Sequence, residues 1–224
     1  MTGAPRPRRA ARERAILEAA LGVFGEAGYA GASMDAIALA AGISKPTLYQ
    51  YFPGKEALFA AMMGMGRDLM LDPLEAPTGG DMVARLHAFA WAYADFVLRP
   101  ELLSLARLVV GEAQRFPEIG RAYQAAGPDR LLEGIMGYLE GQRAAGRLVF
   151  GDAELAAQDF WALILSAPRT RALHRPDAPP RRDEVRRYLE NGLRVFLRAY
   201  AADPAAELVR LDTLLATEIR RPIA

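Results

Sequence analysis

The stretch that decides the fold is Ser33–Phe52, SMDAIALAAGISKPTLYQYF. Ser33 and Ser44 each precede a short run of helix-forming residues, and a serine hydroxyl is a favoured N-cap. Gly42 lies between the runs and permits the left-handed backbone that ends a helix. The pattern predicts two short helices, 34–41 and Lys45–Tyr51, joined by a tight turn. This is the arrangement of a helix-turn-helix, whose second helix enters the major groove of DNA.

The second helix has one apolar face and one polar face. Leu48 and Phe52 are four residues apart and are expected to face the core with Ile43. The opposite face then presents Lys45, Thr47, Tyr49, Gln50 and Tyr51. Side chains of these types suit a groove lined by base edges and phosphates.

Each polar residue of this helix has a plausible partner in DNA. Lys45 can donate to guanine or to a phosphate, and Gln50 can pair with adenine or reach the backbone. Thr47 offers a hydroxyl, and a methyl for thymine, whereas Tyr49 and Lys55 suit phosphates. Spacing alone leaves an alternative open, in which two amphipathic helices pack as a hairpin that binds no DNA.

Charge is concentrated at the N-terminal end. Residues 1–55 carry seven Lys or Arg against four Asp or Glu, which is net +3, whereas the rest carries 21 against 23, net −2. Five of these cations are Arg6, Arg8, Arg9, Arg12 and Arg14. They can neutralise phosphates, or they can form a solvated flexible tail.

Helical periodicity continues on both sides of the motif. Residues 9–27 form a predicted first helix that ends near Gly28, and a fourth helix runs from about Lys55 toward Pro73. Further helices are expected over 82–98, 101–114, from Pro117, 128–145, 153–166, 183–201 and 204–220, with loops over 72–81 and 168–182. Few β-branched residues and no strand pattern accompany them. The prediction is an all-α protein of about nine or ten helices.

Several classes of protein are disfavoured by composition. There is no cysteine, which removes disulfides and thiol chemistry and fits a cytoplasmic location. No apolar run reaches the roughly 18 residues of a membrane span. His87 and His174 have no partners nearby in sequence, and the motifs of metalloproteases, phosphate-binding loops and serine hydrolases are missing. We therefore expect no enzyme activity, no metal and no cofactor.

The motif and its flanks resemble the DNA-binding domain of the TetR family over about 50 residues without a gap. The matching features include Ile16, Ala20, Phe24, Gly28-Tyr29, Ile37-Ala38, Ala41-Gly42, Ser44, Leu48-Tyr49, Tyr51-Phe52 and Lys55. The resemblance implies operator contacts from Lys45, Pro46, Thr47, Tyr49, Gln50 and Tyr51, and phosphate contacts from Lys55 and Ser33. Asp35 departs from the basic or hydroxyl-bearing members, so no base contact is expected from it.

The resemblance also implies a division of labour along the chain. Residues 1–55 are expected to form the DNA-binding domain, with Ser44 in the turn also among its DNA-binding residues, and 56–224 a ligand-binding and dimerisation domain. Stretches such as LARLVVGEAQRFPEIGRAY are similar to one subclass of the family. The implied function is a homodimeric repressor that a small-molecule effector releases from double-stranded operator DNA. An activator of the same family, or a helical interaction module without DNA binding, are the alternatives.

Two apolar helices are the dimerisation candidates. Residues 153–166 and 183–201 from each subunit can form a four-helix bundle about a two-fold axis. The interface residues predicted on this basis are Phe160, Leu163, Tyr188, Leu189, Leu193 and Phe196. The alternative is that both apolar stripes are used in the core of a single chain.

An effector pocket is predicted from large, soft side chains in the C-terminal region. These are Phe89, Trp91, Phe96, Tyr123, Met136, Phe160 and Trp161, with Glu112 or Arg115 as polar anchors. Aromatic residues and methionine suit a lipophilic or aromatic ligand. Core packing explains the same residues equally well.

Overall fold

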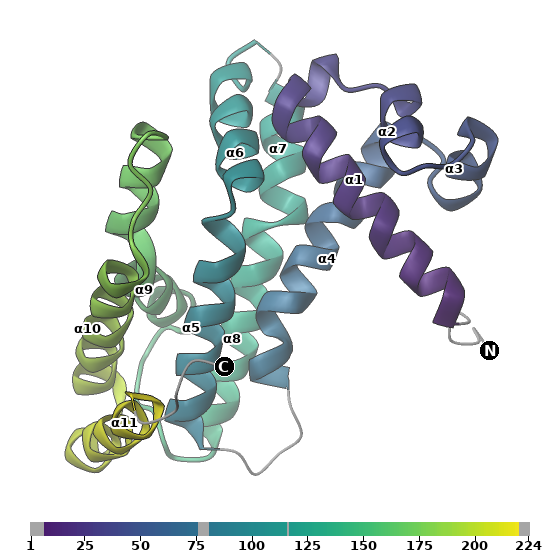
Figure 1. Cartoon of the computed structure of the whole chain (residues 1–224). Coiled ribbons are helices and arrows are strands. Elements are labelled where there is room, and N and C mark those ends of the chain that lie inside the picture. The colour runs from purple at the N-terminus through teal and green to yellow at the C-terminus, as the bar shows by residue number, and fades with distance from the viewer. Residues whose placement is uncertain (1–6, 76–80, 116, 220–224) are drawn as a thin grey trace. The chain divides into compact units, whose positions relative to one another are not determined.

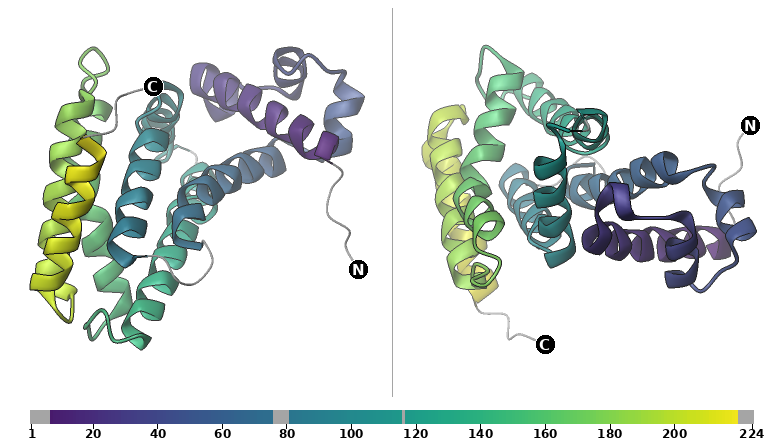
Figure 2. Two further views of the ribbon diagram at one scale, coloured as in Figure 1. Left: turned by 60° about the horizontal axis from the view of Figure 1, so that its bottom comes forward. Right: turned by 90° about the horizontal axis from the view of Figure 1, so that it is seen from above.

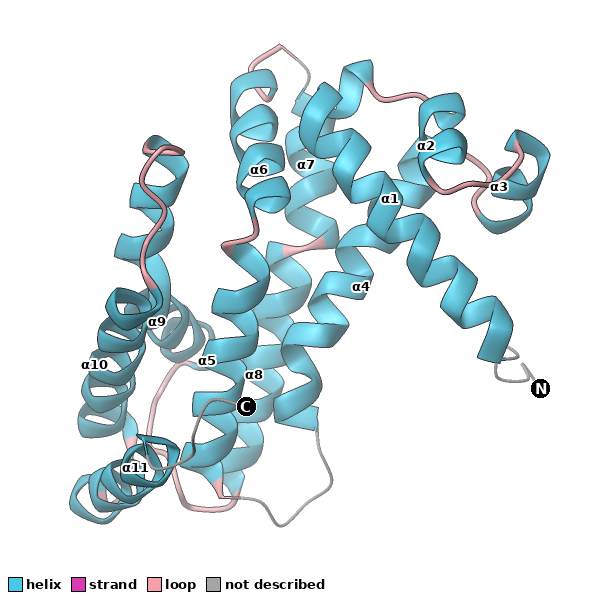
Figure 3. Ribbon diagram, viewed as in Figure 1, coloured by secondary structure: helices cyan, strands magenta, loops and turns pink. Residues whose placement is uncertain are grey.

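The computed structural model describes residues 7–75, 81–115 and 117–219 (Figure 1). Over these ranges the chain forms eleven helices, whereas about nine or ten were expected. Their bounds are α1 Pro7–Gly31, α2 Met34–Ala40, α3 Lys45–Tyr51, α4 Lys55–Glu75, α5 Met82–Val97, α6 Pro100–Glu112, α7 Pro117–Ala126, α8 Pro128–Ala144, α9 Ala153–His174, α10 Arg182–Tyr200 and α11 Pro204–Ile219. The described ranges contain helices and loops but no strand (Figure 3), and their β pairing is limited to one isolated bridge, Leu148 to Ala201. The all-α prediction is confirmed.

The chain divides into two compact units, and each has its own set of packed helices. Unit 1 contains the described parts of 1–68 and 98–130, and unit 2 those of 69–97 and 131–224. In unit 1, α1 packs against α2 and α6, α2 against α3, and α6 against α7. In unit 2, α10 packs along α9 and also contacts α5 and α11 (Figure 2).

Glycines end the helices around the motif where the sequence predicted them to. The backbone of Gly28 has φ 70°, and that of Gly42 has φ 64°. Both values lie in the left-handed region that glycine adopts without a steric penalty. The first breaks α1 before its final turn, and the second forms the bend between α2 and α3.

Buried aromatic side chains fill the core of each unit. In unit 1, Phe24 meets Phe59 edge to face, with ring centroids 5.4 Å apart. In unit 2, Phe160 lies 5.7 Å from Phe89 and 5.0 Å from Phe196, and all three are fully buried. These contacts hold α5, α9 and α10 together.

The predicted loops 168–182 and 72–81 are wrong in part, since helix continues into both. α9 passes through Pro168 and ends at His174. Ile164, Pro168 and Ala172 are buried at helical spacing, so the packed face compensates for the backbone hydrogen bond that proline cannot donate. Likewise, α4 passes through Pro73 to Glu75, and 76–80 lie outside the described residues.

Candidate nucleic-acid interface and effector site

Serine caps position the two helices of the motif. The Ser33 hydroxyl accepts a hydrogen bond from the Ala36 N–H at 3.1 Å at the start of α2. The Ser44 hydroxyl accepts one from the Thr47 N–H at 3.3 Å and lies 2.7 Å from the Thr47 hydroxyl. Such bonds satisfy backbone donors that have no partner inside the helix. Ser44 therefore contributes mainly to the geometry of the turn.

The buried face of α3 determines which side chains point outward. Leu48 is fully buried. Phe52, directly after α3, and Ile37, in α2, are also buried. Lys45, Pro46, Tyr49 and Gln50 are exposed, and Thr47 and Tyr51 are partly exposed. The short helix thus presents most of the residues predicted to contact DNA on one accessible surface.

Lys45 does not extend alone into solvent. Its ammonium nitrogen lies 2.9 Å from each carboxylate oxygen of Asp35, the residue that departs from the family pattern. Hydrogen bonding to Asp35, followed by its negative charge, raises the pKa of Lys45. The side chain therefore stays protonated and is tied to α2.

Lys55 has an internal role that the sequence did not indicate. Its ammonium donates to the carbonyl oxygens of Tyr29 at 2.7 Å and Ala32 at 3.0 Å, and lies 4.7 Å above the Tyr29 ring. These carbonyls belong to the C-terminal end of α1, where cations are favoured. Burial, followed by the charge of Glu56, raises the pKa of the Tyr29 hydroxyl. Lys55 thus fastens α4 to α1.

The N-terminal arginines that the structure describes form part of α1 and not a separate tail. Arg9, Arg12 and Arg14 are exposed on this helix, and the guanidinium of Arg9 lies 5.5 Å above the Tyr51 ring. Arg6 is outside the described residues, and the side chain of Arg8 is not described. The contact of Arg9 with Tyr51 places a cation beside the end of α3.

The residues predicted for the effector pocket do not form one group. Glu112, Arg115 and Tyr123 belong to unit 1, whereas the other predicted residues belong to unit 2. Trp91 donates to the His87 ring at 3.2 Å and lies 4.3 Å from the Arg182 guanidinium. Met136 and Phe96 are partly exposed, whereas Phe89 and Phe160 are core residues.

Four buried side-chain polar atoms in the described part of unit 2 have no hydrogen-bond partner, and two of them belong to aromatic residues. These two are the indole nitrogen of Trp161 and the hydroxyl of Tyr138. Burial raises the pKa of Tyr138 to about 12. Trp161 also meets Tyr93 edge to face at 5.9 Å. Unpaired buried donors are costly, and an acceptor atom from a bound molecule would satisfy them.

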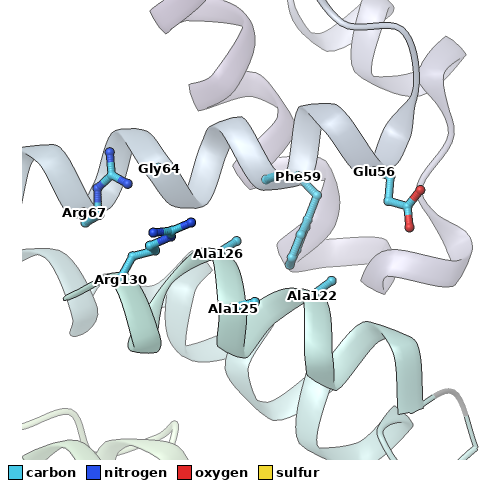
Figure 4. Close-up of a pocket in the computed structure, with 9 residues that line it drawn as sticks. Glu56, Phe59, Gly64, Arg67, Ala122, Ala125, Ala126 and Arg130 are labelled. Carbon is cyan, nitrogen blue, oxygen red and sulfur yellow. The ribbon is translucent and has the colours of Figure 1, made fainter. Parts of the chain in front are cut away.

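A cavity of about 410 Å³ opens between α4 and α7 in unit 1 (Figure 4). Its walls are Glu56, Phe59, Ala60, Gly64, Arg67, Ala122, Ala125, Ala126 and Arg130. None of these residues was predicted for the pocket, because most of the lining is alanine, glycine or charged side chains and Phe59 is the one aromatic residue in it. No group of three metal-ligating side chains occurs within the described ranges.

The predicted dimer-interface residues are divided by burial. Phe160, Leu189, Leu193 and Phe196 are fully buried inside the single chain, so their side chains belong to its core. Leu163 and Tyr188 are partly exposed. The Tyr188 hydroxyl accepts a hydrogen bond from Arg171 at 3.0 Å. Exposed apolar residues on the same two helices include Leu155, which is 62% exposed, and Val195, which is 37% exposed.

Two capped helices joined by a glycine turn, with one buried anchor face and one polar exposed face, define a helix-turn-helix protein of the all-α class. Comparisons with known proteins identify its family. Residues 16–62 match the model for bacterial regulatory proteins of the tetR family, and 84–202 match that for the AefR-like transcriptional repressor C-terminal domain. The chain belongs to the TetR family and is a transcriptional regulator with a DNA-binding domain. TetR-family regulators are not enzymes, in agreement with the expectation from the sequence.

Solved structures match most of the chain. A TetR-family transcriptional regulator from Mesorhizobium loti MAFF303099 is 29% identical, with a TM-score of 0.71 over 88% of this chain and 100% of that one. The flavonoid-responsive regulator FrrA is 31% identical, with a TM-score of 0.62 over 86% of this chain and 98% of that one. The resemblance predicted from the motif is confirmed.

Curated relatives match over a shorter segment. The regulator RutR of Escherichia coli K12 is 46% identical over 66 residues, which is 30% of this chain and 31% of RutR. The transcriptional activator FasR of Mycolicibacterium smegmatis is 39% identical over 88 residues, 38% of this chain and 40% of FasR. The chain thus spans less than half of the length of these relatives. No helix of the described ranges is long and apolar enough to cross a membrane.

Proposed function

We propose that this protein is a homodimeric repressor that binds operator DNA through α3 and leaves it when a small lipophilic or aromatic effector binds. The observation that carries the proposal is the exposed polar surface of α3, held in place by buried Leu48 and by the Ser44 cap. A rigid short helix with an accessible polar face suits the major groove. The match to an AefR-like repressor domain supports repression over activation.

The proposed DNA contacts fall into two kinds. Lys45, Thr47 and Gln50 read base edges, and Pro46 packs beside them. Ser33, Ser44, Tyr49, Tyr51 and Lys55 hold the phosphate backbone. The interactions of Ser44 and Lys55 within the protein make them positioning groups first. Residues 1–55 constitute the proposed DNA-binding domain, and 56–224 the regulatory domain.

The proposed effector site lies among the aromatic side chains of unit 2. The unpaired Trp161 N–H and Tyr138 hydroxyl support this location, since a ligand acceptor there satisfies buried donors. Trp91, Phe96 and Met136 supply partly exposed apolar surface beside the buried Phe89 and Phe160, whereas Glu112 and Tyr123 belong to unit 1 and are left out of the site in unit 2. FrrA is described as flavonoid-responsive, which favours an aromatic effector.

The proposed dimer interface uses the exposed faces of α9 and α10. Leu155 and Val195 are exposed apolar residues, and Leu163 and Tyr188 are partly exposed beside the buried stripe. Pairing these faces buries apolar surface that a single chain leaves in water. Homodimers are typical of the family, and a two-fold dimer presents two α3 helices to two half-sites.

A selection experiment tests the proposal. The wild-type protein is used to enrich duplexes from a random DNA library, and binding is then measured with and without candidate aromatic ligands. We expect one enriched, two-fold symmetric sequence and weaker binding by Tyr49→Ala, with Val110→Ala on α6 as the exposed control. Enrichment of no sequence contradicts DNA recognition, and unchanged binding across an aromatic ligand panel contradicts effector release.

A further inference from the structure

An ion pair bridges the two helices of the motif on the surface proposed to meet DNA. Lys45 is the first residue of α3, and Asp35 lies in the first turn of α2. The Lys45 nitrogen is 2.9 Å from both Asp35 oxygens. The two side chains are 51% and 67% exposed, so the pair lies at the surface.

The fold itself does not require this pair. Ser33 and Ser44 already cap the two helices, and fully buried Ile37 and Leu48 anchor them. Ion pairs exposed to this degree contribute little to stability. The Asp35 carboxylate also stabilises the N-terminus of α2 through the helix dipole. This contribution is small, and α2 keeps its Ser33 cap when a neutral residue replaces Asp35. Because the ion pair contributes little to stability, we expect Asp35 to act mainly on DNA binding.

A carboxylate beside Lys45 acts on DNA binding in two ways. It cancels one of the positive charges that attract phosphates, which weakens sequence-independent binding. It also limits the positions that the flexible lysine ammonium can take, so the ammonium is presented at one place. A lysine that is fixed in this way discriminates between base edges better than a mobile one.

Resting on the proposed DNA contact of Lys45, we infer that Asp35 is a positioning and specificity-determining residue. It restrains Lys45 for base readout and lowers the affinity for DNA that lacks the operator sequence. Asp35 itself touches no base. Its effect on DNA is exerted through Lys45.

The inference predicts a change in the ratio of two affinities. Replacing Asp35 by Asn removes one negative charge and keeps the shape of the side chain. The slope of log K against log salt concentration for non-operator DNA then steepens by about 0.9 per protomer. If the variant and the wild type bind equally at 1 M salt, this slope makes the affinity of the variant at 0.1 M salt about 8-fold higher per protomer. Binding to the operator gains less, because the restraint on Lys45 is lost.

The experiment uses the full chain and two defined probes. One is the duplex enriched by the wild-type protein from a random library, and the other is a scrambled duplex of equal length and composition. Asp35→Asn, Lys45→Gln and the double variant are compared at several KCl concentrations. Glu26→Gln, an exposed carboxylate of α1 in the same unit, is the charge-matched control. Circular dichroism confirms that each variant folds.

The outcomes separate this inference from the proposed function. We expect Asp35→Asn to bind the scrambled duplex more tightly and to lose discrimination, with no change for Glu26→Gln. In the Lys45→Gln background, Asp35→Asn still removes one repulsive charge, but it should not change the discrimination between the two duplexes, since the restraint acts through Lys45. Unchanged discrimination in Asp35→Asn, or a loss of discrimination that is additive with that of Lys45→Gln, overturns the inference. Failure of the wild type to enrich any sequence contradicts the proposed function instead.

Discussion

The sequence predicted DNA binding for the helix pair α2–α3 and dimerisation for the helix pair α9–α10. The two pairs use their apolar residues differently. In α2–α3 a small buried face, centred on Leu48, leaves a polar surface free to act. In α9–α10 the apolar stripe is largely used inside the chain, because Phe160, Leu193 and Phe196 are fully buried. An apolar stripe indicates that one face of a helix is buried. It does not indicate whether that face packs inside the same chain or against a second copy. The predictions below test this contrast.

The largest effect is expected at Phe196. Its ring lies 5.0 Å from that of Phe160 and 4.9 Å from that of Tyr200, and it is fully buried. Phe196→Ala should lower the free energy of unfolding by about 3–5 kcal/mol. Urea denaturation of the variant and the wild type measures this loss. An intact fold with only a weaker dimer would mean that Phe196 belongs to the interface after all.

A smaller effect is expected at Gly192, where α10 lies close to the backbone of α9. A Cβ added at Gly192 would lie 2.4 Å from the backbone carbonyl oxygen of Leu163. Gly192→Ala must push the helices apart, which we expect to cost about 1–3 kcal/mol. Gly137→Ala on α8, where a Cβ meets nothing within 4 Å, is the matched control. Equal melting temperatures for the two variants would show that the close approach is absent.

Lys55 and Lys45 offer a comparison within unit 1. Lys55→Met removes the donor to the Tyr29 and Ala32 carbonyls and should cost about 1–2 kcal/mol of stability. Lys45→Gln loses only an exposed ion pair and should cost less than about 1 kcal/mol. Thermal unfolding measures both. The salt dependence of DNA binding by folded Lys55→Met reports separately on any phosphate contact.

The smallest effect is expected at Tyr138, whose buried hydroxyl has no partner. Tyr138→Phe should leave stability unchanged or raise it by up to about 1 kcal/mol. Because burial raises the folded-state pKa to about 12 from 10.0, the wild type should lose stability as the pH rises between these values. Alkaline unfolding curves check this. A destabilised Tyr138→Phe would reveal a hydrogen bond of that hydroxyl.

Local patterns allowed much of the fold and of the motif to be predicted. Ser33, Ser44 and Gly42 act within three or four residues of their positions, so their roles could be inferred from neighbours in the sequence. The continuation of α9 beyond Pro168 could not be predicted, because it depends on burial of one face of this helix against the rest of unit 2. The Lys55 bonds to α1 join residues 26 and 23 apart and carry no local signal. The Asp35–Lys45 pair was missed for the same reason.

Methylation interference on the enriched duplex tests the central claim most directly, because it reports which groove α3 enters. Methylation of guanine N7 blocks the major groove, and methylation of adenine N3 blocks the minor groove. The account predicts interference at guanine N7 in two half-sites about one helical turn, or a multiple of it, apart. Interference confined to adenine N3, or no interference at either position, would contradict recognition of the major groove by α3.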